Sequence, residues 1–367
     1  MHTKRLYPLS HDPITFSFAQ SIKDFVVEEL PSQTFSDNGD TLILKIKKKN
    51  LSTWDLLRIL STKLRLPTDK MGHAGLKDKH ATTTQYISIP YKYKDELEGF
   101  SSEGIKIMAM FRHNRSLKTG ELKGNRFFVR LKHVAPHAAG RLEKNFRLIE
   151  KNGMPNYFGY QRFGKGKDNF DQAKEVAYGE AHIQDKKVRS LLISAYQSHF
   201  FNAWLAQRVT LMKEQKTPLL PLLQGEVMMP YSDGDTFSPK INRKVEEDYK
   251  AKKIVPTGLL PGRKVWRSRE EAGELEAQFD DGFIHEKGHR RAAWVFPSDM
   301  SYKYIFDKEY VELEFTLPKS AYATVVIENL GNFNLHHDIK EAKKVRGLKT
   351  PKPQVDAEDE YYDEDDY

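Results

Sequence analysis

Alternation of apolar and polar residues predicts strands along much of the chain. Within 41–47, Leu42, Leu44 and Ile46 lie on one side at a period of two, which is the pattern of a strand with one buried face. Comparable patterns predict four further strands, at 84–89, 105–111, 126–134 and 311–317. The first third of the chain is therefore expected to contain a sheet.

Helical spacing of apolar residues appears between these strands. Ser52 or Thr53 can cap a helix whose apolar stripe ends at Pro67. Three more helices are expected: one at about 137–151, a long one at about Lys187–Met212, and a short one from a capping box at Ser268 to Phe279. Ser320 could cap a final helix carrying Tyr322, Val325 and Val326. The Pro- and Gly-rich segment 218–261 is expected to be rich in loops, and residues from about 340 onward to be disordered.

Composition narrows the possible classes of protein. The 367 residues are 39% apolar and 30% charged, which is typical of a globular chain of about two domains. No apolar run is long enough for a membrane helix, and the start lacks the apolar core of a secretory signal, so a cytoplasmic protein is expected. Cysteine is absent, which excludes disulfides, thiolate nucleophiles and iron–sulfur clusters. Any chemistry must use oxygen or nitrogen groups.

The charge distribution indicates a polyanionic partner. The net charge is +8, but residues 356–367 hold eight acidic residues and no Lys or Arg. The rest of the chain has 59 basic residues against 43 acidic ones, a net charge of +16. Such a basic body favours nucleic acid as the partner. A globular protein that is merely basic is the alternative that charge leaves open.

The segment from Gly72 to Gln85 carries the most unusual combination of residues. Asp78 lies between two lysines, with His80 close behind. Flanking cations favour an ionised carboxylate, so Asp78 is predicted to be a charged acceptor or nucleophile. A solvated turn is the alternative. His73 and His80 lack a third ligand at a recurring zinc spacing, so no metal site is predicted.

The segment 156–166 combines four aromatic residues with an amide and a guanidinium group. Such a loop could stack a base, bond its edge and hold a phosphate, although its aromatic residues could equally be core. Gly159, Gly164 and Lys165 fit a phosphate-loop pattern, but Gly166 replaces the hydroxyl that would bind magnesium. A nucleoside triphosphatase that depends on Lys165 is therefore a weaker alternative.

A third segment, 112–126, is a basic loop that leads into a predicted strand. Its five cations could contact phosphates, or could simply form a solvated loop. They are Arg112, Arg115, Lys118, Lys123 and Arg126.

Taken in order, four signatures resemble the TruD family of tRNA pseudouridine synthases. They are A-G-L-K-D-K-H-A at 74–81, R-H-N-R-S-L-K-T-G-E-L-K-G-N at 112–125, P-N-Y-F-G-Y-Q-R-F-G at 155–164 and S-A-Y-Q-S-H-F-F-N at 194–202. Shorter matches lie at 24–28, 260–262 and 317–324. The resemblance covers about residues 10–332.

The resemblance implies an α+β pseudouridine synthase fold, with a mixed, largely antiparallel sheet, flanking helices and an inserted TruD-specific α/β subdomain. The catalytic domain is expected at 1–181 and 296–339, and the insertion at 182–295. A flexible basic-then-acidic tail is expected at 340–367.

The resemblance also assigns roles to residues of this chain. Asp78 is similar in position to the family's catalytic aspartate. Phe25, Asn156 and Tyr322 fall where family members contact the target nucleotide, although that last position is more often Phe. Phe158 would stack on the base, and Lys77 and Glu28 would complete a charged pocket. Phosphate contacts are expected from the five cations above together with Arg162 and Lys165.

The implied activity is isomerisation of uridine 13 in the D-arm of a tRNA, in bacterial members usually the glutamate acceptor. No cofactor and no metal are expected, and the family favours a monomer without an obligatory protein partner. Asp78 would either attack C1′ or remove a C2′ proton, and the sequence does not choose between these routes. An RNA-binding protein without catalysis, which would not need Asp78, is the alternative function.

Overall fold

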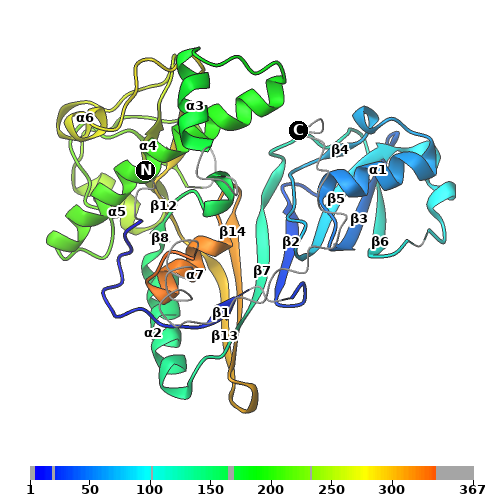
Figure 1. Ribbon diagram of the computed structural model, residues 1–367, viewed down its shortest axis with the longest axis horizontal. Helices are drawn as coiled ribbons and strands as arrows, with labels where there is room; N and C mark the ends of the chain where they lie inside the picture. The colour runs from blue at the N-terminus through cyan, green and yellow to red at the C-terminus, as the bar shows by residue number, and fades with distance from the viewer. Residues whose placement is uncertain (1–4, 19–20, 101, 164–168, 232–233, 336–367) are drawn as a thin grey trace. The chain divides into compact units, whose positions relative to one another are not determined.

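The described part of the chain divides into two compact units. The computed structural model describes residues 5–18, 21–100, 102–163, 169–231 and 234–335, with the side chains of Asn169 and Lys187 excepted (Figure 1). Among the described residues, the sheet unit comprises those within Ile14–Lys151 and Pro297–Ala323, and the helical unit comprises those within Asn152–Phe296, at 5–13 and at 324–335. The predicted tail and Lys165 lie outside the described residues. The predicted domain limits at 181/182 and 295/296 stay a prediction.

A single large sheet forms the body of the sheet unit. Its strands are β1 (Ser17–Phe18), β2 (Phe25–Pro31), β3 (Thr41–Lys49), β4 (Gly72–His73), β5 (Thr82–Pro90), β6 (Ile105–His113), β7 (Leu122–Lys132), β13 (Ser298–Ile305) and β14 (Tyr310–Pro318). The order is β13-β14-β7-β2-β5-β3-β6, with β1 beside β7 and β4 beside β5. β2 and β5 are parallel, and the other pairs are antiparallel. The predicted fold class is therefore confirmed.

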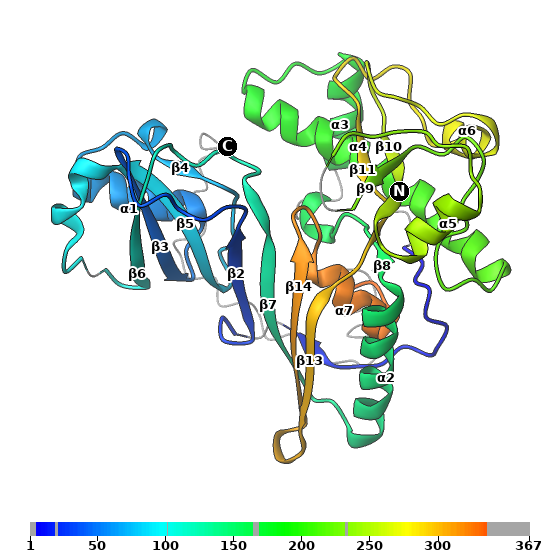
Figure 2. The same ribbon diagram turned by 180° about the vertical axis from the view of Figure 1, so that it is seen from behind.

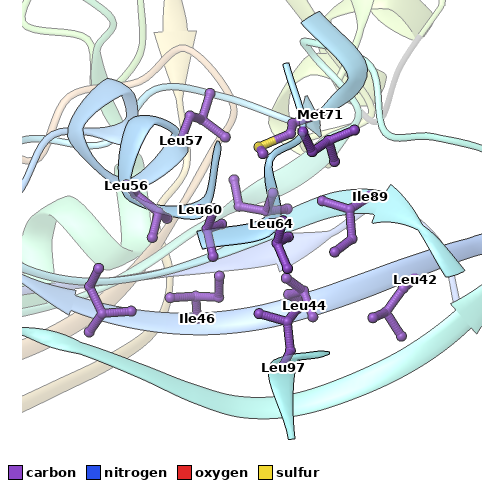
Figure 3. Packing of buried hydrophobic residues seen from close by; sticks show 13 residues of the cluster. Leu42, Leu44, Ile46, Leu56, Leu57, Leu60, Leu64, Met71, Ile89 and Leu97 are labelled. Carbon is purple, nitrogen blue, oxygen red and sulfur yellow. The ribbon is translucent and has the colours of Figure 1, made fainter. Parts of the chain in front are cut away.

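One face of this sheet packs against helix α1 (Thr53–Leu64). Leucines of α1 meet Leu42, Leu44 and Ile46 of β3 in one cluster of buried residues (Figure 3). The helix starts at Ser52 with a capping box, in which the Ser52 hydroxyl accepts from the Asp55 backbone N–H and the Asp55 carboxylate accepts from that of Ser52. The predicted cap and apolar stripe are confirmed.

Helix α2 (Pro136–Asn152) lies beside strands β13 and β14 (Figure 2). Aromatic rings join the helix to both strands. The Phe146 ring centre lies 6.1 Å from that of Tyr302 and 6.5 Å from that of Phe315. The apolar residues of β14, at alternate positions from Val311 to Leu317, are all 0% exposed. The period-two pattern of this strand thus predicted its buried face correctly.

The helical unit is built around a long helix and small sheets. Its helices are α3 (Asn169–Tyr178), α4 (Lys186–Glu214), α5 (Arg243–Lys250), α6 (Glu270–Ala277) and α7 (Ala323–Gly331, from Thr324 on). Its strands are β8 (Met154–Pro155), β9 (Met228–Pro230), β10 (Ile254–Leu260), β11 (His289–Ala292) and β12 (Trp294–Val295). They pair as β11-β10-β9 and β12-β8, and α4 confirms the predicted long helix.

The predictions failed where local chemistry was misjudged. The segment 218–261 is rich in loops, as expected, although it also contains β9, α5 and β10. The capping box at Ser268 is wrong, because α6 begins after Arg269 and the Ser268 hydroxyl donates to the buried Glu276 carboxylate at 3.0 Å. The final helix begins at Ala323, and Ser320 instead has a left-handed backbone with φ 67°.

The described helices are also unsuited to crossing a bilayer. None of them combines the length and the hydrophobicity that a membrane span needs.

Candidate active site

The loop between β4 and β5 presents Asp78 to solvent. Lys77 is buried, whereas Asp78 is exposed. The two neighbours therefore point to different sides, as adjacent residues do in extended backbone. The Lys77 ammonium forms an ion pair with Glu29, and its backbone N–H donates to the Thr53 hydroxyl at 2.9 Å. Lys77 thus anchors the loop from below while Asp78 faces outward.

Two opposing influences act on the Asp78 carboxyl. Surrounding protein atoms desolvate the group and raise its pKa from the usual value, even though the residue keeps solvent-exposed surface. The positive charges of Lys48, Lys77 and His80 act to lower that pKa. The sequence predicted the cationic surroundings, but it gave no sign of the desolvation that outweighs them.

Lys48 is a fully buried cation near this carboxyl. It is 0% exposed, and its ammonium donates to the Leu51 carbonyl. Burial lowers the pKa of Lys48 to about 8, and the charge of Asp78 partly opposes that shift. Because this lysine is buried, its positive charge acts on the loop while its ammonium is not exposed to bind a substrate.

The Lys77–Glu29 pair yields a stability prediction. Both side chains are almost completely buried, at 5% and 1% exposure. Glu29→Gln would leave the Lys77 ammonium buried without its counter-charge, so we expect the free energy of unfolding to fall by about 3–5 kcal/mol. Urea denaturation followed by circular dichroism measures this loss.

The neighbouring residue gives a matched control. Glu28 pairs with Lys45 at 2.7 Å, but its side chain is 41% exposed. Exposed pairs contribute about 0–1 kcal/mol, so Glu28→Gln should unfold nearly as the unaltered protein does. Equal losses in the two variants would contradict the anchoring role of Glu29.

The other predicted nucleotide contacts of the sheet unit have varied surroundings. Phe25 is 8% exposed, and its ring stacks on Phe127 with a centre-to-centre distance of 6.1 Å. Glu28 is engaged by Lys45, and Tyr322 is half-buried just before α7. Phe25 and Glu28 share β2, while Tyr322 follows β14. Their roles stay predictions.

In the helical unit, Arg291 contacts both Asn156 and Phe158. The Arg291 guanidinium donates to Asn156 Oδ1 at 2.8 Å and to the Asn156 carbonyl at 3.1 Å. Its central carbon lies 3.9 Å from the centre of the Phe158 ring. Asn156 Nδ2 donates to the Ala292 carbonyl at 2.9 Å. Both predicted contact residues are thus buried, with Asn156 5% and Phe158 6% exposed.

The motif on α4 holds this loop in place. Asn202 bonds the Phe158 backbone twice, accepting from its N–H at 2.9 Å and donating to its carbonyl at 3.0 Å. Ser198 accepts from the Arg162 guanidinium at 3.4 Å. Because Phe158 is fixed by its backbone and by Arg291, a base could stack on its ring only after local movement.

Three of the five cations predicted to contact phosphates in 112–126 already interact with other groups of the protein. Arg115 pairs with Glu121 and Arg126 pairs with Glu314. The Arg112 guanidinium donates to the Gly39 carbonyl and lies 4.4 Å from the centre of the Tyr91 ring. Lys118 and Lys123 are exposed. β7 begins at Leu122, so the loop is shorter than the basic segment predicted.

Sequence reasoning missed Glu29, Lys48 and Arg291. Each of them is a buried charged residue. For Lys48 the sequence did offer a signal, because this charged residue occupies a core-facing position of an alternating strand. Among the described residues, no group of three or more His, Cys, Asp or Glu is placed to hold a metal ion.

The fold of the chain has a counterpart among solved structures. A crystal structure described as that of tRNA pseudouridine synthase D (TruD) from Methanosarcina mazei superposes with a TM-score of 0.71. It is 22% identical in sequence, and the match covers 90% of this chain and 97% of that one. The chain therefore has the pseudouridine synthase fold of that protein.

Sequence comparison gives the particular family. The model of the family described as tRNA pseudouridine synthase D (TruD) matches residues 2–172 and 174–330. tRNA pseudouridine synthase D of Wolinella succinogenes is 42% identical over 362 residues, covering 92% of this chain and 99% of that protein. The Nitratiruptor protein of the same name is 40% identical, covering 89% and 98%. The chain belongs to the TruD family of tRNA pseudouridine synthases and is an isomerase of that class.

Proposed function

We propose that the chain converts uridine 13 in the D-arm of a tRNA, expected to be the glutamate acceptor, to pseudouridine, with Asp78 as the reacting group. The observation that carries this proposal is the exposed Asp78 carboxylate on a loop anchored by the buried Lys77–Glu29 pair. Family membership supports the reaction, and it favours an enzyme over an RNA-binding protein without catalysis. We also propose that the protein acts on tRNA in the cytoplasm and, as the family resemblance favours, as a monomer.

The reaction moves one bond and exchanges one hydrogen. In the first route the Asp78 carboxylate attacks C1′, a carboxylate–C1′ bond forms, and uracil leaves with the N1–C1′ electron pair. After uracil turns, C5 attacks C1′ and displaces the carboxylate. The C5 proton then passes to solvent, and N1 takes up a proton. In the second route the carboxylate takes a C2′ proton, and N1 leaves with its electron pair to give a glycal. C5 then bonds to C1′ while the proton returns to C2′, the C5 proton passes to solvent, and N1 takes up a proton. Both routes need an ionised Asp78.

We further propose that Phe25, Glu28, Asn156, Phe158 and Tyr322 surround the flipped nucleotide. Lys77, which is buried beneath the loop in its pair with Glu29, would contribute its positive charge to this pocket. The cations Arg112, Arg115, Lys118, Lys123, Arg126, Arg162 and Lys165 would contact phosphates. Extruding the uridine costs a few kcal/mol, which stacking and edge hydrogen bonds offset. Since Asn156 and Phe158 are buried, their part requires local movement when RNA binds.

The position of modification can be tested with defined RNA. Incubation of unmodified tRNA-Glu transcript with the protein should give one pseudouridine, at position 13, detected by carbodiimide adducts that stop primer extension. A transcript with cytidine 13 should give none. Modification at other positions with uridine 13 untouched would refute the proposed target while leaving the family assignment in place.

A further inference from the structure

The helical unit carries a basic surface that no predicted site residue belongs to. Two segments, 262–266 and 285–289, lie side by side through a parallel bridge between Arg263 and Lys287. The Arg263 N–H donates to the Glu286 carbonyl at 2.7 Å, and the Gly288 N–H donates to the Arg263 carbonyl at 2.9 Å. The two segments therefore form one continuous surface.

Glycine allows this close approach. Gly262 has φ +154°, and a Cβ there would lie 2.5 Å from the Glu286 carbonyl oxygen. A Cβ on Gly288 would lie 2.5 Å from Val265 Cγ1. Neither position could hold a larger residue without separating the segments.

A buried residue of the α4 motif fixes both segments. Gln197 is 6% exposed, and its Nε2 donates to the Pro261 carbonyl at 2.7 Å and to the Lys287 carbonyl at 3.2 Å. The motif S-A-Y-Q-S-H-F-F-N thus holds this surface through Gln197, just as it holds Phe158 through Asn202. The backbone of both segments is thus hydrogen-bonded to α4.

The outward side chains of the two segments share positive or aromatic character. We name these six exposed residues the basic ridge: Arg263, Lys264, Trp266, His285, Lys287 and His289. Trp266 is 46% exposed, although its backbone carbonyl accepts from Arg290 at 3.3 Å. The Arg263 guanidinium donates to His285.

Nearby carboxylates do not neutralise the basic ridge, because they are engaged by other cations. Glu286 pairs with Arg189, and Asp280 pairs with Arg267. Glu276 pairs with the buried Arg290 at 2.6 Å. Glu270 and Glu271 lie further along, in the first turn of α6. The ridge therefore retains a surplus of positive charge next to an exposed indole, the combination that suits phosphates and a stacked base.

The basic ridge is joined directly to Asn156. β11 starts at His289 in the ridge and ends at Ala292, whose carbonyl accepts from Asn156 Nδ2. Four residues of strand span only about 10–14 Å. RNA lying on the ridge would be a short distance from a nucleotide held at Asn156.

We propose that the basic ridge binds the backbone of the RNA substrate beside the target nucleotide, with one base stacked on Trp266. This inference rests on the proposed function of the chain as the enzyme that modifies this RNA. The ridge adds affinity and positions the RNA, and it takes no part in breaking the N1–C1′ bond.

The test measures binding of unmodified tRNA-Glu transcript as a function of KCl concentration. The double variant Arg263→Gln, Lys287→Gln should reduce the slope of log Kd against log KCl by about 1–2, since each lost phosphate contact removes about 0.9. Trp266→Ala should weaken binding by about 5- to 100-fold with an unchanged slope.

A matched control comes from the same unit. The double variant Lys244→Gln, Lys250→Gln removes two exposed cations of α5 and should leave the slope unchanged. An unaltered slope in the double variant Arg263→Gln, Lys287→Gln, unaltered affinity in Trp266→Ala, or an equal loss of slope in the control would overturn the proposal. Asp78→Asn should bind RNA with the unaltered slope and give no product. Turnover by Asp78→Asn would instead refute the role of Asp78. The proposal for the basic ridge would still be tested by the salt dependence of RNA binding in its variants.

Discussion

Asp78→Asn is expected to abolish release of tritium from tRNA that carries 5-³H-uridine, with the single-turnover rate falling by more than about a thousand-fold. The amide has the shape of the carboxylate, but it can neither attack C1′ nor accept a C2′ proton. Each C5–C1′ bond formed expels one C5 hydrogen, so tritium release counts catalytic events directly. The residue is exposed, so its replacement should leave the fold intact.

Asp69→Asn is the control for this experiment. Asp69 is an exposed aspartate of the same unit, in the short 3₁₀ helix Thr68–Lys70, and its amide variant should turn over normally. Asp78→Asn should still bind the transcript, because a carboxylate repels phosphates rather than attracting them. Unaltered turnover in Asp78→Asn would show that another group performs the chemistry.

Much of the sheet unit was predictable from alternation and capping chemistry. β14 is an example, since each apolar position of its period-two pattern is 0% exposed. The helix cap at Ser52 was also predicted correctly, because the residues that form it are adjacent in the sequence. The same motif at Ser268 failed, because the distant Glu276 and Arg290 compete for the polar groups there. Local patterns hold where no buried charge interferes.

The candidate site was less predictable, because burial depends on tertiary packing. The flanking cations of Asp78 were evident in the sequence, whereas its desolvation was not. Asn156 and Phe158 were predicted as contacts, and the arginine that bonds one and covers the other lies more than 130 residues away in the chain. No local pattern encodes such a pairing.

Lys48 shows where a stricter use of periodicity would have helped. In β3 the even-numbered residues Leu42, Leu44 and Ile46 are buried, and Lys48 is the next on that face. The strand extends to Lys49, two residues beyond its predicted end. A lysine that continues an apolar face is either an error of register or a buried cation. In this chain it is a buried cation near Asp78.

Lys48→Met is expected to impair catalysis at low pH while it stabilises the fold. The reaction needs ionised Asp78, so its rate falls as the pH drops through the pKa of that carboxyl. The Lys48 charge acts to lower this pKa, in opposition to desolvation. Without that charge the pKa rises further, and the acid limb of the single-turnover rate should move to higher pH.

Stability should change in the opposite direction. Burial lowers the pKa of Lys48 from 10.5 to about 8, so below pH 8 the folded protein carries a cation that water would hold more favourably. That penalty disappears as the pH rises toward 10.5, because the unfolded chain then also loses its proton. Methionine removes the penalty, which at pH 7 is at most about 3 kcal/mol, less the lost hydrogen bond to Leu51.

The two readouts together separate an electrostatic role from a structural one. Urea denaturation at pH 7 should show Lys48→Met at least as stable as the unaltered protein, while its acid limb lies at higher pH. Lys49→Met, which changes the exposed neighbour at the end of β3, should leave both unaltered. An acid limb of Lys48→Met that stayed in place would mean that the Lys48 charge does not act on the reacting group. A large loss of stability would instead mean that Lys48 serves mainly to hold the end of β3 against Leu51.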